Sequence, residues 1–275
     1  MARAPFNPIG TTALVTGASS GLGIGYAHQL AERGADLVLV ARRQDRLEAL
    51  AVELAEKYGT VSTVIPLDLA RADAVPELVA DLEQRDISVG TLVNSAGFGT
   101  YGNFVDLDPA RELEEITVNV STLTALTQAL LPGLLSTAIS NPHGAALVNL
   151  GSTASFQPVP HMAVYGASKA YVLSFTEALW YETRSTGLKV LAVCPGPVKT
   201  EFRKVAQNEE ASYGGSLTVD DVMRTTFDAL DRAVTPTHVV VGAQNRALAR
   251  LVAVIPRRAV LSAIGSRSIP GRSRA

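Results

Sequence analysis

The first forty residues contain a pattern that few folds accommodate. A short apolar run, Thr11–Val15, leads directly into the glycine-rich segment Thr16-Gly-Ala-Ser-Ser-Gly-Leu-Gly23. Apolar residues at helical spacing follow, Gly34 ends them, and a second apolar run occupies Leu37–Val40. Strand, glycine-rich turn, helix and strand within about thirty residues form the βαβ unit that binds dinucleotides in doubly wound sheets.

The glycines of such a turn let the backbone bend sharply and contact a pyrophosphate, which the first amides of the helix then bind. The spacing here is G-x-x-x-G-x-G rather than the commoner G-x-G-x-x-G. An ordinary tight turn between a strand and a helix therefore remains an alternative. The turn would offer these residues to a cofactor: Gly17, Ser19, Ser20, Gly21, Leu22 and Gly23.

The end of the second apolar run indicates which dinucleotide would bind. NAD enzymes commonly place Asp or Glu there to accept from the ribose 2′-hydroxyl. This chain has Ala41 followed by Arg42 and Arg43, so guanidinium groups are available to bind a 2′-phosphate. We therefore expect NADP(H), with Arg42 as the main contact. The alternative is that Arg43 and Arg46 only cover the face of a helix over Gln44–Tyr58.

Two further strand ends add candidates for the same site. Val61–Pro66 is a predicted strand that leads to Asp68 and Leu69, and ligands bind beyond the carboxyl ends of strands in open α/β sheets. Asp68 would accept from an adenine amino group, or would equally serve as a turn residue. The predicted strand over 91–94 runs into the small residues Ser95-Ala-Gly97, where a cofactor would press on the backbone.

A second pattern points to chemistry. Tyr165 and Lys169 are four residues apart, so on a helix their side chains lie on one face. A free phenol titrates near ~10, and a fixed ammonium beside it is expected to draw its pKa towards neutrality. Ser152, beyond the predicted strand 145–150, would hold a carbonyl oxygen against the phenol. Taken alone, such a Tyr–Lys pair is usually a surface pair.

Composition narrows the class of protein. Of 275 residues, 47% are apolar and 18% charged, which suits a large core and excludes general disorder. The net charge of −2 predicts neither nucleic acid nor membrane as a partner. The single cysteine, Cys194, follows an apolar run and is expected to be buried and inert, and four scattered histidines make a metal site improbable. Without an N-terminal signal pattern, we expect a cytoplasmic protein.

These motifs together resemble the short-chain dehydrogenase/reductase family, in its branch of about 250-residue subunits. The matching segments occur in the family's order and span Thr11 to about Phe202. They are the glycine turn, Asp68, Asn94-Ser-Ala-Gly97, Asn119, Ser152, Tyr165-x3-Lys169 and Pro195-Gly-Pro-Val-Lys-Thr200. The family's usual Asn-Asn-Ala-Gly is Asn94-Ser95-Ala96-Gly97 here, which puts one contact between neighbouring strands in doubt. The resemblance implies one doubly wound α/β domain, with a parallel sheet of about seven strands in the order 3-2-1-4-5-6 plus an added strand and helices on both faces.

The resemblance also assigns roles. Tyr165 would be the general acid in reduction and the base in oxidation, Lys169 would lower its pKa and bind the nicotinamide ribose, and Ser152 would bind the substrate oxygen. Asn119, on a helix from about Pro109 to Leu130, would hold a water of a proton relay; without the resemblance it reads as structural. The residues implied to line the nicotinamide side of the cofactor are Asn94, Ala96 and Gly97. Those implied to close over its carboxamide and diphosphate are Pro195, Gly196, Val198 and Thr200. Family members commonly pair through the helices that carry Asn119 and Tyr165, which implies a homodimer or homotetramer.

The residues expected to face the substrate are mostly apolar, which favours a hydrophobic ketone or alcohol over a sugar or an acid. They are Phe98, Tyr101, Phe156, Val159, His161, Met162 and Phe202. Segment Glu201–Ser216 is expected to act as a lid. The predicted function is NADP(H)-dependent interconversion of a carbonyl and a secondary alcohol on a substrate resembling a ketosteroid, a 3-oxoacyl group or an aryl ketone. A catalytically silent nucleotide-binding sensor or scaffold is the alternative.

The C-terminal segment differs from the rest in charge. From Arg232 onward there are eight arginines and no acidic residue, so this segment carries +8 and residues 1–231 carry −10. Arg246–Ile264 alternates arginine with apolar residues, which predicts a basic amphipathic helix that packs on the substrate lobe and precedes a disordered tail. The alternative is a helix lying on an anionic membrane surface. We expect residues 1–245 to form the dehydrogenase domain and residues 246–275 this basic appendage, in the same domain or added to it.

Overall fold

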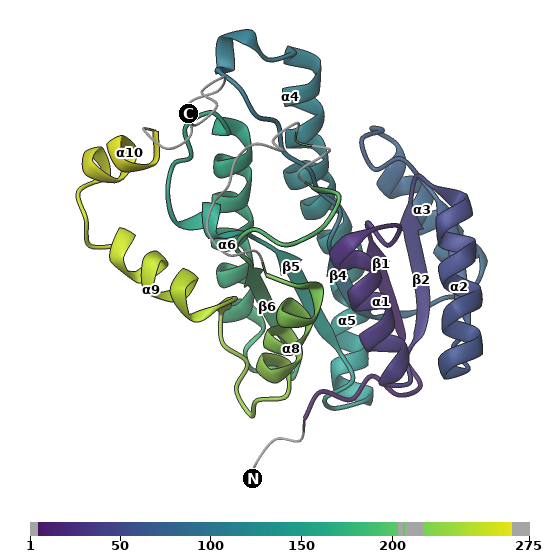
Figure 1. The fold of residues 1–275 in the computed structure, drawn as a ribbon. Coiled ribbons are helices and arrows are strands. Elements are labelled where there is room, and N and C mark those ends of the chain that lie inside the picture. The colour runs from purple at the N-terminus through teal and green to yellow at the C-terminus, as the bar shows by residue number, and fades with distance from the viewer. Residues whose placement is uncertain (1–4, 203–205, 207–216, 266–275) are drawn as a thin grey trace.

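The computed structural model describes residues 5–202, 206 and 217–265, and its centre is a seven-stranded parallel sheet in the order β3-β2-β1-β4-β5-β6-β7 (Figure 1). The predicted fold class and strand order are confirmed. The strands are β1 Thr12–Thr16, β2 Asp36–Ala41, β3 Ser62–Pro66, β4 Val89–Asn94, β5 Ala146–Leu150, β6 Lys189–Cys194 and β7 His238–Val240. The order reverses between β1 and β4, and this switch point is where open α/β sheets form their ligand crevice.

Helices cover both faces of the sheet and each face has its own core. Side chains of β1 alternate between them, with Ala13 and Val15 in one core and Leu14 in the other. One face is covered by α1 (Gly21–Glu32), α2 (Gln44–Tyr58) and α8 (Val219–Leu230). The other is covered by α3 (Ala74–Gln84), α5 (Leu123–Ser140) and α6 (Ala163–Thr183).

The helix that carries Asn119 is longer and less regular than expected. It starts as α4 (Pro109–Ile116), widens into a π-helical segment, η2 (Thr117–Thr122), and continues as α5 through Pro132 to Ser140 rather than ending near Leu130. A proline inside a helix removes one hydrogen bond, but α5 packs along β4 and this contact outweighs the loss. Within the described residues, this 32-residue stretch alone passes a test of length and composition for crossing a membrane, with a mean hydropathy of 1.3 over an 18-residue window.

The predicted single helix over 246–264 is wrong. The segment forms α9 (Ala243–Val252) and α10 (Arg257–Gly265), because Pro256 disfavours helical backbone at the residue before it. The expected packing is also slight, since the described residues of α9 include no buried side chain and α10 buries only Val260. Residue 246 lies inside α9, so the proposed domain boundary falls within a helix. The expected tail and all of the expected lid except Glu201, Phe202 and Ala206 lie outside the described residues.

Candidate active site

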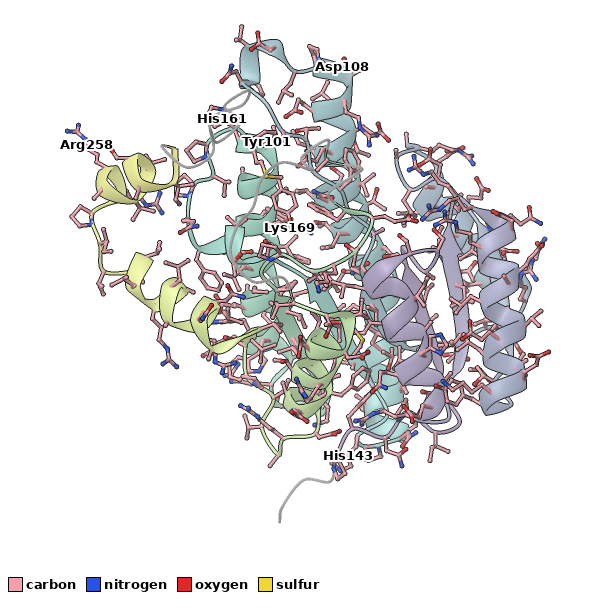
Figure 2. The ribbon with its side chains drawn as sticks, in the orientation of Figure 1. Tyr101, Asp108, His143, His161, Lys169 and Arg258 are labelled. Carbon is pink, nitrogen blue, oxygen red and sulfur yellow. The ribbon has the colours of Figure 1, made fainter. Side chains whose placement is uncertain are left out.

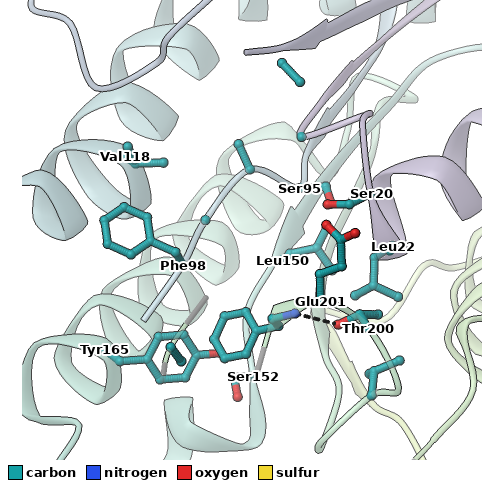
Figure 3. A pocket seen from close by; sticks show the side chains of 18 of the residues that line it. Ser20, Leu22, Ser95, Phe98, Val118, Leu150, Ser152, Tyr165, Thr200 and Glu201 are labelled. Carbon is teal, nitrogen blue, oxygen red and sulfur yellow. Dashed lines mark hydrogen bonds between the residues drawn. The ribbon is translucent and has the colours of Figure 1, made fainter. Parts of the chain in front are cut away.

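A cleft of about 430 Å³ lies at the carboxyl ends of the strands, between the glycine turn and the start of α6 (Figure 3). It brings together residues from eight separate segments of the chain. Of the expected cofactor contacts, these line it: Gly17, Ser19, Ser20, Gly21, Leu22, Arg42, Arg43, Asp68, Leu69, Ala96, Gly97, Pro195, Gly196, Val198 and Thr200. Ser152, Tyr165 and Lys169 line it too, whereas Gly23, Asn94 and Asn119 lie outside its wall.

The glycine turn has the backbone that the sequence predicts. Gly17 has a φ of +69°, and a Cβ there would lie 3.0 Å from the backbone of Ala96. Thr16 fixes this approach, because its Oγ1 accepts hydrogen bonds from the amides of Ser95 and Ala96, both at 3.0 Å. Gly23 serves packing rather than the cleft, since a Cβ there would lie 2.2 Å from the carbonyl oxygen of Gly17.

The first turn of α1 opens into this cleft and suits an anion. Its N-cap residue, Ser20, makes no capping hydrogen bond through its side chain to the described residues, and the first turn holds no acidic side chain. The amides at the start of the helix therefore keep their capacity to bind a negatively charged group. Bare glycine backbone beside a helix start fits the pyrophosphate of a dinucleotide.

Basic side chains gather at the end of the cleft beyond β2. Arg43 turns away from the surface of α2: its Nε and Nη2 donate to Ser19 Oγ at 3.2 and 3.1 Å, and its Nη1 lies 2.9 Å from Glu201 Oε2. Arg42 is more exposed, and the carboxylate that it pairs with among the described residues is Glu114, at 3.9 Å. Asp68 lines the cleft and also accepts from the amide of Ala70 at 3.1 Å, so both roles expected of it are compatible with its position.

At the other end, β5 delivers Ser152 to a short helical turn, η3 (Thr153–Phe156). Ser152 Oγ accepts from the amide of Ala154, and Ser155 Oγ accepts from the amide of Ser152 at 3.2 Å while donating to the carbonyl of Lys169 at 2.7 Å. Ser155 therefore joins the segment of Ser152 to the helix of Lys169. Ser155 was not among the residues expected at the site, although the spacing Ser152-x-x-Ser155 resembles a capping box.

Tyr165 and Lys169 lie on the first turns of α6, and Figure 3 shows the phenol beside Ser152. The Lys169 ammonium lies 5.8 Å from the centre of the Tyr165 ring and donates to the carbonyl of Leu150 at 2.7 Å. Figure 2 shows Lys169 inside the molecule, whereas Arg258 points outward from α10. The structure thus brings together the hydroxyl, the phenol and the ammonium that the sequence placed in one site.

The expected lowering of the phenol's pKa is not what this structure shows. Burial raises the pKa of Tyr165 to about 12, against the opposing effect of its hydrogen bond with Ser152. Burial also lowers the pKa of Lys169 to about 8. Desolvation is the largest effect on both groups, and the phenol is held in its protonated form. Burial raises the pKa of the Cys194 thiol to about 12, which agrees with the expected inert cysteine.

Asn119 lies behind the cleft, in the π-helical segment. Its Nδ2 donates to the carbonyl of Phe98 at 2.8 Å and to Ser168 Oγ at 3.1 Å, and its Oδ1 accepts from the amide of Phe98 at 3.2 Å. A Cβ on Gly97 would lie 2.8 Å from Asn119 Oδ1 and 3.4 Å from Lys169 Nζ. Asn119 therefore fixes the loop after β4 against α6, and its direct contacts are with backbone and serine rather than with Lys169.

Asn94 belongs to a buried series of hydrogen-bonded polar side chains that runs across β4 and β5 on one face of the sheet. We call this series the polar chain. Asn94 Nδ2 donates to Thr127 Oγ1 and to Asn149 Oδ1, at 3.0 and 2.9 Å, and Asn149 Nδ2 donates to Thr176 Oγ1 at 2.9 Å. The polar chain links α5, β4, β5 and α6 below the site. Sequence reasoning missed Asn149, although an asparagine inside an apolar strand always requires a partner.

The wall near Tyr165 is apolar but differs in part from the expected set. Phe98, Met162 and Phe202 line the cleft, and the centre of the Phe202 ring lies 5.4 Å from that of Tyr165, with the two rings tilted by 53°. Val118 and Leu150 were not anticipated there. The other expected contacts pack elsewhere: Phe156 with His238, Tyr101 with His161, and Val159 against Gly166.

Comparison with known proteins agrees with this architecture. Residues 11–211 match the family described as short chain dehydrogenase. The chain is 36% identical over 231 residues to sulfoacetaldehyde reductase 2 of Chromohalobacter salexigens. The aligned region covers 82% of this chain and 89% of that protein.

Two solved structures are similar over nearly the whole chain. One is a short-chain dehydrogenase from Sphingobium yanoikuyae in complex with NADPH, with a TM-score of 0.77, 32% identity, and coverage of 96% of this chain and 100% of that one. The other is a bulky-bulky ketone specific alcohol dehydrogenase from Comamonas testosteroni, with a TM-score of 0.71, 28% identity, and coverage of 96% and 97%.

Proposed function

The chain belongs to the short-chain dehydrogenase family, and on that premise we propose that it interconverts a hydrophobic ketone and its secondary alcohol with NADP(H). It is an oxidoreductase that acts on carbonyl or CH–OH groups, so the alternative of a silent scaffold is set aside. One observation carries the finer proposal. Tyr165, Ser152 and Lys169 meet beside an apolar wall, at the far end of the cleft from the arginines.

The cofactor, when bound, supplies or accepts the hydride. The glycine turn and the start of α1 would hold its pyrophosphate, and Arg42 and Arg43 lie where a 2′-phosphate would be bound. The solved relative named for its complex with NADPH supports this choice of cofactor.

Ser152 Oγ and the Tyr165 hydroxyl are the groups that would bind a substrate carbonyl oxygen. Because the phenol is protonated in this environment, it can donate its proton to that oxygen as negative charge develops during reduction. Lys169, fixed by the carbonyl of Leu150, places a positive charge behind the phenol and stabilises the phenolate left by proton transfer.

The apolar wall favours a hydrophobic substrate over an anionic one. Of the described residues that line the cleft, the only cation near Ser152 and Tyr165 is Lys169, which is already bonded to Leu150. A sulfonate would need a further cationic partner there. The relative named for bulky ketones therefore provides a better guide to the substrate than the one named for sulfoacetaldehyde.

The test is NADPH consumption, followed by absorbance, with a panel of hydrophobic ketones and with sulfoacetaldehyde. We expect turnover of bulky ketones by the natural chain and its loss in Tyr165→Phe, with NADPH binding retained. Tyr171→Phe is a matched control, because this tyrosine lies on the same helix and bonds to Thr124 outside the cleft. Preference for sulfoacetaldehyde would overturn the proposed substrate class.

A second candidate is action at an anionic membrane surface, on lipid-like substrates. The exposed Leu248, Leu251 and Val254 of the α9 region lie in the segment whose eight arginines have no acidic counterpart. Flotation with vesicles containing phosphatidylserine tests it. Recovery with vesicles should fall when Leu248 and Leu251 are both replaced by serine, and equal recovery on neutral vesicles would contradict it.

A further inference from the structure

Glu201 forms ion pairs with Arg43 and Arg46 at the end of the cleft beyond β2. We call this the phosphate end, because a 2′-phosphate would bind there, and the end at Tyr165 the reactive end. Glu201 Oε2 lies 2.9 Å from Arg43 Nη1, and Glu201 Oε1 lies 2.9 Å from Arg46 Nη1. Arg43 is held in place on its other side by Ser19 of the glycine turn. One carboxylate therefore bridges two arginines, one of which is anchored to the turn that would hold the pyrophosphate.

This cluster lies where the ribose 2′ group of a bound dinucleotide is expected. Arg43 is the N-cap residue of α2, directly beyond the carboxyl end of β2, which is the position that distinguishes NAD from NADP in doubly wound folds. Arg43, Ser19 and Glu201 all line the cleft. Carboxylate and phosphate bind the same donors of a guanidinium fork, so they compete for it.

The carboxylate is an anion throughout the neutral range. Hydrogen bonds from Arg43 and Arg46 hold the pKa of Glu201 below its usual value. The three side chains are each exposed by 39–45%, so the ion pairs are individually weak and a phosphate with a higher charge can displace the carboxylate. Figure 3 shows Glu201 beside Ser20 and Thr200, on the side of the cleft away from Tyr165.

We propose that Glu201 is a cofactor-selecting residue, an internal anion that a 2′-phosphate must displace from Arg43 and Arg46. The inference rests on the proposed use of NADP(H). When the cofactor lacks a 2′-phosphate, Glu201 stays in place and neutralises the arginines, so that NAD(H) is tolerated. When the 2′-phosphate is present, part of its binding free energy is used to release Glu201, which reduces the preference for NADP(H).

The experiment measures binding of nucleotide fragments by calorimetry, so that no turnover is involved. Adenosine 2′,5′-bisphosphate and adenosine 5′-monophosphate differ only in the 2′-phosphate. In Glu201→Gln, which keeps the size of the side chain, we expect the bisphosphate to bind about threefold to tenfold more tightly than in the natural chain. The affinity for the monophosphate should stay the same or fall.

Asp81→Asn is the matched control, because it removes one negative charge from an exposed ion pair with Arg85, which lies outside the cleft. It should leave both affinities unchanged. Unaltered binding of the bisphosphate in Glu201→Gln would overturn the inference, as would an equal gain for both nucleotides. If the natural chain does not prefer the bisphosphate at all, the proposed use of NADP(H) itself fails, whatever Glu201→Gln shows.

Discussion

The two ends of the cleft are held by different kinds of interaction. At the phosphate end, exposed side chains form ion pairs, as Glu201 does with Arg43 and Arg46. At the reactive end, Lys169 is buried and Tyr165 is half-buried, and desolvation shifts the pKa of each. Exposed pairs are weak and exchangeable, whereas buried groups are costly to disturb. Changes at the first end should therefore alter which cofactor binds, and changes at the second should alter whether the enzyme works or folds.

The largest expected effect is at Lys169. Lys169→Met removes the charge behind the phenol and should lower kcat by about a hundredfold to ten-thousandfold. In the natural chain kcat/KM for reduction should fall as the pH rises through about 8, because the buried ammonium loses its proton there. Steady-state kinetics from pH 6 to 10 would show this limb and its loss in the variant.

Lys57→Met is the matched control, since this lysine lies over the exposed side of Tyr58 on α2. It should leave both kcat and the pH profile unchanged. If Lys169→Met kept the kcat of the natural chain, catalysis would not depend on the buried charge at the reactive end. The proposed difference between the two ends of the cleft would then be wrong.

The next effect concerns the polar chain beneath the reactive end. Asn149→Ala removes one buried hydrogen bond from Asn94 and one from Thr176, although each keeps another partner, and leaves a cavity; it should lower the free energy of unfolding by about 2–4 kcal/mol. Urea unfolding measures it. Asn103→Ala, which removes an exposed hydrogen bond to Asp106, should cost less than about 0.5 kcal/mol. Equal losses in the two variants would mean that the polar chain adds nothing to the fold.

The third effect is a dependence of stability on pH that the reactive end alone should show. Glu115 is fully buried next to the site, its Oε2 accepts from Thr100, and its Oε1 has no hydrogen-bond partner among the described residues. Burial raises its pKa to about 7, and the neighbouring Glu112 adds to this while Lys169 opposes it.

The folded chain therefore binds a proton between pH 4.5 and 7 that the unfolded chain releases, so stability should fall as the pH rises through this interval. The expected loss between pH 5 and pH 7 is about 2 kcal/mol, or about 4–8 °C in Tm. Thermal unfolding at pH 5 and pH 7 should show it in the natural chain and in the exposed control Glu48→Gln, but not in Glu115→Gln. A Glu115→Gln protein that keeps the full difference would show that another group is responsible.

The parts of the molecule that could be predicted are those fixed by neighbours in the sequence. The strand, glycine turn and helix from Thr12 to Glu32 carry their own signals, because Gly17 and Gly21 adopt positive φ values that few other residues accept. Tyr165 and Lys169 could be paired because helical spacing alone places them on one face. The order of the strands followed from the family resemblance.

The features that could not be predicted from the sequence depend on contacts between segments that are far apart in the chain. Arg43 was expected either on a phosphate or on the face of α2, but Glu201, 158 residues away, holds it. The phenol's pKa followed burial rather than the nearby charge, and burial is not visible in a spacing of four residues. Pro132 and Pro256 look alike in sequence, yet only the second lies in a break between two helices. The first lies in a helix that packs along β4, while the second lies in a segment that packs on little.

The smallest expected effect is at Arg42, which the sequence favoured as the main contact of the 2′-phosphate. Its side chain is 61% exposed, and its ion pair among the described residues is the one with Glu114 at 3.9 Å, so within that part of the chain neither packing nor a close partner fixes its position. Arg42→Ala should weaken binding of adenosine 2′,5′-bisphosphate by about twofold to fivefold and leave binding of adenosine 5′-monophosphate unchanged, because an exposed charge contributes about 0.2–1 kcal/mol.

Arg43→Ala should weaken binding of the bisphosphate more, since Ser19 holds that guanidinium in position. Arg71→Ala, which breaks exposed pairs with Asp73 and Glu77 outside the cleft, is the control. If Arg42→Ala weakened binding of the bisphosphate more than Arg43→Ala did, the unanchored Arg42 would be the main contact of the 2′-phosphate. The role proposed for Glu201 on Arg43 would then lose its basis.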